Sequence, residues 1–336
     1  MSDETLLSFC IPTYNFGEFI GETLASIVPQ MEDNMEIVIV DGGSTDSTEE
    51  IVSGFQKMYP NIYYHKFEQR GGIDRDMALS ISLAKGKYCW LFSADDVLKR
   101  GAVAKLLSKT EGGIDVYLVG LTLCGLDVDT VLSEHFFSAI QTDMVVNLSD
   151  EKERLSYFEN ARTTTAFFSF MSSLIIDRKK WKESSVDERF YGNCWTHVVR
   201  LFNMIPQGLK LKLLPESYMR KRGDNDSFME HGAVHRAAIS IDGFHDMGKT
   251  LFGEDSKEAF HFRRVVRNEL SAPVLLAKKA KARNREERRQ LNQLAQKNFS
   301  DPSLKNRLSY ALYSSIPTFT LPLLQKIWRL KRFIKT

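Results

Sequence analysis

The sequence predicts an α/β protein, with a mostly parallel sheet flanked by helices and a mainly helical, basic C-terminal extension. Two observations predict this fold class. Short apolar runs alternate with segments of helical periodicity between residues 6 and 92, which is typical of β-α-β units with parallel strands. Positive charge gathers near the C-terminus, where residues 257–336 hold 19 Lys and Arg against 5 Asp and Glu.

The first part of the chain supplies four strands and three helices. Each expected strand is a short run of mainly apolar residues, and the strands are placed at 6–11, 36–40, 62–66 and 88–92. The helices between them are placed at 18–28, from the turn after Asp41 to about Met58, and at 74–85. Cap residues and acids precede the second helix, and Gly86 follows the third, as expected at helix ends.

The second part of the chain is less regular. Strands are expected near 115–121, 167–176 and 209–214, and helices near 177–182 and 195–205. From about residue 233 onward the pattern is mainly helical. A domain boundary is therefore expected near residue 230.

The composition is that of a globular protein, with 43% apolar and 26% charged residues. The four cysteines form no C-x-x-C pair, which argues against a zinc finger or a disulfide scaffold and suits a cytoplasmic protein. The N-terminus lacks the pattern of a secretory signal, and no apolar stretch of 18 residues predicts a transmembrane helix.

Three polar segments follow successive strands, where ligands of open parallel sheets bind. They are Thr13-Tyr14-Asn15, Asp41-Gly42-Gly43-Ser44 and Asp95-Asp96. Taken singly, Asp41 is also explained as a turn residue, and Asp95-Asp96 as caps of a helix starting near Val97. Taken together, in this order, the three segments favour a binding site.

The chain has neither a G-x-G-x-x-G after its first strand nor a P-loop, the two glycine-rich motifs that bind nucleotide phosphates. The phosphates of a nucleotide at this site would therefore be bound in another way. A divalent cation held by carboxylates can neutralise a diphosphate instead. Mg²⁺ or Mn²⁺ prefers such oxygen ligands, so we expect one of these ions as cofactor.

These motifs resemble the family 2 glycosyltransferases. The resemblance rests on Ile11–Asn15, Val40–Thr48 and Phe92–Asp96; it is clear over 5–125 and weaker to about 228. It implies a Rossmann-type GT-A fold, a nucleotide-diphosphate sugar as donor, and inversion at the sugar. Residues 1–230 would then be the catalytic domain, with a nucleotide-binding half, 1–125, and an acceptor half, 126–230.

The resemblance assigns roles around the nucleotide. Pro12, Thr13 and Tyr14 would border the base, and Asp41 would accept hydrogen bonds from the base or ribose. Asp74 would lie near the nucleotide, with a plain helix cap as the alternative.

The resemblance also places the metal. Asp95 matches the last acid of the D-x-D motif that binds metal and diphosphate, but Ser93 replaces the first acid. Metal binding is therefore expected at Asp95, with help from Asp96. In the basic loop 220–227, Arg222 and Asn225 would close over the diphosphate, unless this loop is merely solvated.

The general base is less evident. Residues 187–201 are similar to the acceptor-site helix of the family, but Asn193-Cys194 replaces the usual Glu-Asp. His197, one turn further on, is one candidate for the base, and Asp187 or Glu188 is the other. A purely structural role for His197 remains the alternative.

The basic extension mixes cations with aliphatic and aromatic side chains over 308–335. This composition suits an interfacial segment on an anionic membrane, although packing on the body or on a second subunit would also explain it. The expected enzyme is cytoplasmic and peripheral to the inner face of the plasma membrane. Its expected acceptor is a lipid-linked saccharide in O-antigen or capsule assembly.

Three other functions agree less well with the sequence. A nucleotidyltransferase would show a Gly-rich, basic first loop, which Pro12–Asn15 is not. A scaffold protein that kept the fold and lost the chemistry would explain Ser93 and Cys194. Nucleic-acid binding is supported only by the basic extension, and the net charge of −12 on residues 1–256 opposes it.

Overall fold

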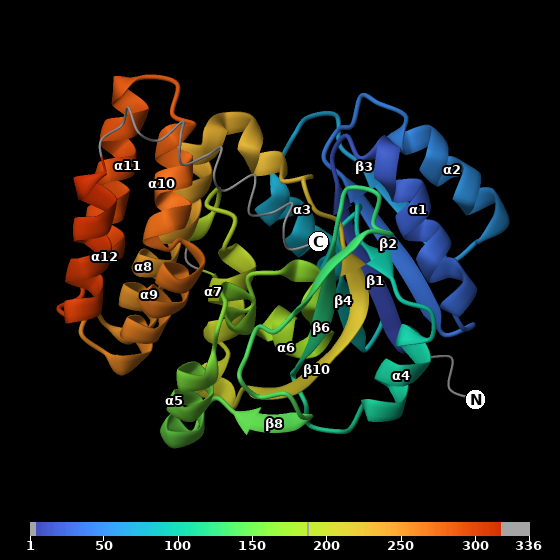
Figure 1. Ribbon diagram of the computed structural model, residues 1–336. Coiled ribbons are helices and arrows are strands. Elements are labelled where there is room, and N and C mark those ends of the chain that lie inside the picture. The colour runs from blue at the N-terminus through green and yellow to red at the C-terminus, as the bar shows by residue number, and fades with distance from the viewer. Residues whose placement is uncertain (1–4, 187, 317–336) are drawn as a thin grey trace. The chain divides into compact units, whose positions relative to one another are not determined.

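The computed structural model describes residues 5–186 and 188–316 (Figure 1). Its chain divides into two compact units, with the boundary between Asn225 and Asp226. The first unit carries a mixed sheet with helices on its faces, and the second is helical.

The parallel part of the sheet has the strand order β3-β2-β1-β4. These strands are β1 (Leu7–Thr13), β2 (Met35–Asp41), β3 (Ile62–Lys66) and β4 (Tyr88–Leu91). All four confirm the expected strands. The register pairs Thr13 with Asp41, so two of the polar segments begin side by side at the carboxyl ends of β1 and β2.

The sheet continues beyond β4 in the order β9-β6-β10-β5. Its members are β5 (Val97–Leu98), β6 (Val116–Cys124), β9 (Leu174–Asp177) and β10 (Lys210–Lys221), while β7 (Val131–His135) and β8 (Met144–Asn147) pair with β6 and β10. Only β6 and β10 are parallel here. An irregularity near Ser217 brings Pro215 so close to Gly120 that a Cβ there would lie 2.0 Å from the Pro215 carbonyl oxygen.

The strand expected at 167–176 is largely wrong. Residues Thr164–Phe167 and Met171–Ser173 form 3-10 turns, and β9 begins only at Leu174. The apolar run there packs as an aromatic cluster instead, with the Phe167 ring centroid 4.7 Å from that of Phe158. A buried apolar run can serve either structure, because its hydrophobicity alone does not fix its period.

The helices of the first unit lie between the strands in sequence. They are α1 (Gly17–Ile27), α2 (Thr48–Met58), α3 (Ile73–Leu83), α4 (Ala102–Lys109), α5 (Glu151–Asn160), α6 (Arg178–Glu183) and α7 (Thr196–Phe202). The helix expected near Val97 is wrong, because β5 occupies that position and α4 begins at Ala102. Neither Asp95 nor Asp96 therefore caps a helix.

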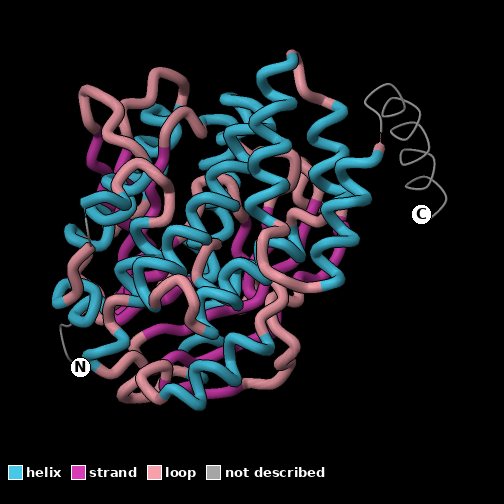
Figure 2. The backbone as a smooth tube through the Cα atoms, turned by 90° about the vertical axis from the view of Figure 1, so that its left-hand side faces the viewer, coloured by secondary structure: helices cyan, strands magenta, loops and turns pink. Residues whose placement is uncertain are grey.

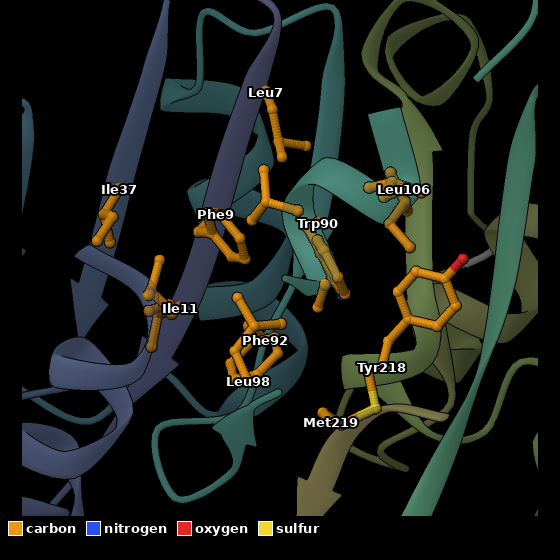
Figure 3. Packing of buried hydrophobic residues seen from close by; sticks show 14 of the residues in the cluster. Leu7, Phe9, Ile11, Ile37, Trp90, Phe92, Leu98, Leu106, Tyr218 and Met219 are labelled. Carbon is orange, nitrogen blue, oxygen red and sulfur yellow. The ribbon is translucent and has the colours of Figure 1, made fainter. Parts of the chain in front are cut away.

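An aromatic core fixes the end of β4. Figure 3 shows Phe9, Trp90 and Phe92 gathered in one cluster, where the Phe9 and Trp90 rings stack with their centroids 5.2 Å apart. The Trp90 indole N–H donates to the Ser172 carbonyl oxygen at 2.8 Å. Because Phe92 is fully buried, Ser93 and Asp95 leave the sheet from a fixed point.

The second unit confirms the helical pattern expected from about residue 233. Its helices are α8 (Gly232–Phe252), α9 (Lys257–Glu269), α10 (Ala272–Ala280), α11 (Arg285–Asn298) and α12 (Leu304–Ser315). In Figure 2 these helices run beside one another, and α8 contacts α9 and α11 while α10 contacts α11 and α12. Within the described residues, no helix is both long enough and apolar enough to cross a membrane.

Candidate active site

Asp41 organises the turn at the end of β2. Its fully buried carboxylate accepts the backbone N–H groups of Gly43 at 3.0 Å and Ser44 at 2.7 Å through Oδ1. Its Oδ2 accepts the Tyr64 hydroxyl, and burial together with this carboxylate raises the pKa of Tyr64. Asp41 is thus a turn residue, and a carboxylate still has lone pairs for a further donor.

The loops after β1 and β2 are tied to each other. The backbone N–H of Asn15 donates to Ser44 Oγ at 2.8 Å, and that of Thr45 donates to Asn15 Oδ1 at 2.9 Å. Tyr14 lies beneath the Arg70 guanidinium, whose Cζ is 4.2 Å from the ring centroid. Two of the expected nucleotide-binding segments therefore form one rigid edge.

Two polar atoms at this edge have no partner among the described residues. Pro12 and Thr13 are both buried, and the Thr13 hydroxyl finds no hydrogen bond there. The same is true of Asp76 Oδ1 in the first turn of α3, on a side chain only 4% exposed. Buried polar groups are nearly always paired, so these two atoms make the edge a candidate for a ligand that bonds to them.

Asp76 is a candidate site residue that the sequence analysis missed. A Cβ on Gly42 would lie 2.7 Å from Asp76 Oδ2, so this carboxyl group lies directly against the loop after β2. Burial raises the pKa of Asp76 to about 6, with Asp41 adding to the effect and Arg75 opposing it. Its only sequence signal, an acid in the first turn of a helix, is common to most helices.

Asp95 lies in the segment that follows β4, and the residue is 8% exposed. The Ser93 hydroxyl donates to Asp95 Oδ1, and the Asn225 side-chain amide donates to Oδ2 at 2.9 Å. The two sequence-predicted residues Asp95 and Asn225 thus come together. Ser93, which replaces an acid of the family motif, orients the remaining acid.

Asp96 faces the interior, which is a correction to the expected metal ligand. Its Oδ2 accepts the Ser172 hydroxyl at 2.6 Å, its Oδ1 accepts the Arg222 backbone N–H at 3.2 Å, and the residue is 1% exposed. Burial, followed by the neighbouring charge of Asp95, raises the pKa of Asp96 to about 8. A carboxyl group enclosed in this way anchors the strand ends and is not presented to an ion.

Arg222 also differs from its expected role in a loop over the diphosphate. The residue is 6% exposed; its Nε donates to the Asp95 carbonyl oxygen at 2.9 Å, and its terminal nitrogens contact Glu22 and the Leu126 carbonyl oxygen. The guanidinium lies over the Phe19 ring, with Cζ 4.7 Å from the centroid. These contacts bury the guanidinium among groups of the protein itself.

His197 is buried as well, which contradicts an accessible general base. It is 4% exposed, and its Nε2 lies 3.0 Å from the Phe168 carbonyl oxygen. Burial lowers the pKa of His197 to about 4, outweighing the nearby Asp74. Of the other two candidates, Asp187 lies outside the described residues, as does the side chain of Glu188.

Asp74 is bonded to the loop that precedes α7. Its carboxylate accepts backbone N–H groups from Gly192, Cys194 and Thr196 in the loop that leads into α7. The expected place of Asp74 near the nucleotide stays a prediction. The alternative expectation, a helix cap, agrees better with these bonds. The capped helix is α7, however, and not α3, to which Asp74 belongs.

A divalent ion fits this donor set only in part. Within the described residues, no three His, Cys, Asp or Glu side chains gather as a metal site. Mg²⁺ and Mn²⁺ sites at nucleotides use one or two carboxylates and complete their shell with phosphate oxygens and water. Asp95 supplies one such carboxylate, although both of its oxygens accept hydrogen bonds here, from Ser93 and Asn225.

The fold and the strand-end acids define the GT-A class of α/β proteins, and comparisons with known proteins identify the family. The model named glycosyl transferase family 2 matches residues 8–176. A relative that is 30% identical over 268 residues covers 79% of this chain and 80% of its own length; it is the abequosyltransferase RfbV of Salmonella typhimurium. The chain belongs to glycosyl transferase family 2 and is an enzyme of the glycosyltransferase class, which confirms the resemblance noted in the sequence.

Other proteins are similar over much of the chain. A GalNAc(5)-diNAcBac-PP-undecaprenol beta-1,3-glucosyltransferase of Campylobacter jejuni is 26% identical over 198 residues, which are 58% of this chain and 59% of the relative. The structure of S. aureus TarS 1-349 in complex with UDP-GlcNAc has a TM-score of 0.60 at 17% identity, with 90% of this chain and 83% of that chain covered. The mannosyltransferase PcManGT of Pyrobaculum calidifontis, in complex with GDP-Man and Mn²⁺, has a TM-score of 0.53 at 15% identity and covers 97% of this chain and 83% of that chain. Both structures confirm the GT-A fold.

Proposed function

We propose that this glycosyltransferase moves a sugar from a nucleotide-diphosphate donor to a hydroxyl of a lipid-linked saccharide, with inversion, during assembly of a surface polysaccharide such as O antigen or capsule. The observation that carries the proposal is Asp95, which Ser93 and Asn225 hold after β4, the strand next to β1 in the sheet. Because β4 pairs with β1 in the sheet, Asp95 follows the strand next to the one that ends at the buried Thr13.

The donor would bind along this edge. Pro12, Thr13 and Tyr14 would line the base, and Asp41 would accept an N–H or O–H of the nucleoside. Asp95 would hold a Mn²⁺ or Mg²⁺ ion, which when bound neutralises charge on a diphosphate. The named complexes of TarS with UDP-GlcNAc and of PcManGT with GDP-Man and Mn²⁺ support this assignment, because they have the same fold.

The acceptor would approach from the side of residues 187–201. Its hydroxyl would attack the anomeric carbon in line with the departing diphosphate, and a carboxylate would take its proton. With His197 buried, we assign the base to Asp187 or Glu188. The undecaprenol-linked acceptor named for the Campylobacter relative supports a lipid-linked acceptor here.

The C-terminal unit would hold the enzyme at the inner face of the plasma membrane. In α12, Leu304, Leu308 and Leu312 are 74%, 62% and 50% exposed, at a spacing that places them on one helix face. Exposed Lys305 and Arg307 lie beside them. The cationic and aromatic residues that motivated the membrane expectation over 317–336 lie outside the described residues.

A nucleotide panel tests this function most economically. We expect one of UDP, GDP, CDP or dTDP, with Mn²⁺, to raise the melting temperature, because only a ligand of the folded state does so. The matching nucleotide sugar should then release nucleoside diphosphate. No shift with any nucleotide would refute the proposal, whereas binding without release would favour the scaffold function suggested by Ser93 and Cys194.

A further inference from the structure

One carboxylate joins two parts of the first unit that are distant in sequence. Asp74 is the second residue of α3 and is 5% exposed. Its Oδ2 accepts the N–H groups of Gly192 at 2.8 Å and Cys194 at 3.2 Å, and its Oδ1 accepts that of Thr196 at 3.3 Å. Thr196 begins α7, so this contact also satisfies one of the free amides at that helix start.

The loop that Asp74 holds has a conformation that it would not adopt without support. Gly192 has a φ of 87° and Cys194 a φ of 71°, so both lie in the left-handed region, which residues other than glycine rarely enter. Such backbones persist only where the surroundings determine them. Three hydrogen bonds to a buried carboxylate supply that determination, since charge-assisted bonds are the strong ones.

The same helical turn also contacts the rigid edge formed by the loops after β1 and β2, which is the donor edge of the proposed function. Asp76, two residues after Asp74, lies against Gly42 in the loop after β2. The helix itself packs on β1 and β2. The first turn of α3 therefore contacts both the donor edge and the loop at Asn193-Cys194, where the family carries its acidic pair.

We infer that Asp74 is a positioning residue for sugar transfer: it fixes the loop 190–196, as one wall of the acceptor site, relative to the donor edge. This inference rests on the proposed function, because it assigns the acceptor to the side of residues 187–201. Asp74 touches neither substrate. Without the Asp74 carboxylate, we expect the loop 190–196 to shift while the donor edge stays in place.

The test separates the two half-reactions in the full-length enzyme. Membrane vesicles from cells lacking this gene supply the unextended acceptor, and hydrolysis of the nucleotide sugar without vesicles reports the donor half-site. In Asp74→Ala, we expect transfer to fall about a hundredfold, as displacement of a reacting group by about 1 Å does. We expect nucleoside-diphosphate affinity and donor hydrolysis to change less than about threefold. Amide exchange should accelerate at Gly192, Cys194 and Thr196.

Two further variants make the result decisive. Asp74→Asn keeps one acceptor oxygen and the shape of the side chain, so its transfer rate should lie between those of Asp74→Ala and the wild type. Asp150→Ala removes a carboxylate that accepts the Glu153 N–H at the start of α5, and it controls for loss of a cap alone.

The possible outcomes are distinct. Transfer and hydrolysis that fall together, or nucleotide affinity that falls tenfold, would overturn the inference and place Asp74 in the donor site. A transfer rate unchanged in both Asp74 variants would also overturn it. Failure of the wild-type enzyme to bind any nucleotide would refute the proposed function instead. If Asp74→Ala does not fold, Asp74→Asn decides alone, by the ratio of transfer to hydrolysis.

Discussion

The guanidinium Nε of Arg222 lies 2.9 Å from the main-chain carbonyl oxygen of Asp95. The backbone N–H of Arg222 also donates to the carboxyl group of Asp96. The residue that follows β10 is thus bonded to both acids that follow β4, and the position of Asp95 depends on a residue 127 positions further along the chain.

Replacing Arg222 by Leu should destabilise the fold and not merely weaken phosphate binding. The change leaves the Asp95 and Leu126 carbonyl oxygens without their donor and Glu22 without its cation. We expect urea unfolding to show a loss of about 2–4 kcal/mol. The matched change Arg220→Leu breaks an exposed pair with Asp129 and should cost less than about 1 kcal/mol. If Arg222→Leu is as stable as the wild type but no longer binds nucleotide, Arg222 binds the diphosphate, as the sequence analysis expected.

The burial of His197 predicts a pH dependence of stability. The pKa of His197 is about 4 in the folded protein, against 6.5 without the protein environment. Between these values the unfolded chain binds a proton that the folded one does not. The contribution is therefore complete above pH 6.5 and is lost as the pH falls toward 4, by at most about 3 kcal/mol.

The variant His197→Gln tests this directly. The slope of unfolding free energy between pH 6.5 and 4 should be shallower than in the wild type, because Gln does not titrate. His135, whose pKa burial also lowers to about 4, is present in both proteins, so the difference isolates His197. An unchanged slope together with a hundredfold slower transfer would instead identify His197 as the base.

The contact between Gly42 and Asp76 predicts a strict requirement for glycine. In Gly42→Ala the new Cβ would meet Asp76 Oδ2 at 2.7 Å and displace either the carboxyl group or the loop. We expect nucleotide affinity to fall at least about tenfold, measured by calorimetry. Gly54, in the interior of α2, has open space around it, so Gly54→Ala should stabilise the protein by about 0.5–1 kcal/mol. Wild-type affinity in Gly42→Ala would mean that Asp76 plays no part at the nucleotide edge.

Removal of residues 317–336 should weaken membrane binding. The segment carries Lys326, Arg329, Lys331, Arg332 and Lys335, and each cation near an anionic leaflet contributes about 1 kcal/mol. Co-sedimentation with phosphatidylglycerol vesicles should fall, while donor hydrolysis persists. Uncharged phosphatidylcholine vesicles are the control. If the full-length and truncated proteins sediment equally, residues 317–336 do not bind the membrane. Binding by both would then assign it to α12, and binding by neither would exclude membrane attachment.

The sequence predicted the strands and their carboxyl ends well, because periodicity and strand-end acids are local properties. Asp41 and Asp95 were proposed in this way, and Asn225 was proposed from the basic loop after the last expected strand. The burial of Arg222 and His197 was not predicted, because it depends on partners far along the chain, Glu22 and Phe168. Asp76 was overlooked because an acid in a first helical turn carries no local sign that a glycine loop will enclose it.

The rate of nucleoside-diphosphate release by Asp95→Asn, compared with the wild type in the presence of Mn²⁺, tests the central claim most directly. The donor is the sugar of whichever nucleotide stabilises the protein most. Asparagine keeps the shape of the side chain and removes its charge. We predict a loss of about a hundredfold to a thousandfold, equivalent to about 3–4 kcal/mol, with a melting temperature within about 4 °C of the wild type. A variant that releases nucleoside diphosphate at nearly the wild-type rate, with its dependence on Mn²⁺ retained, would contradict the assignment of Asp95 to the diphosphate site.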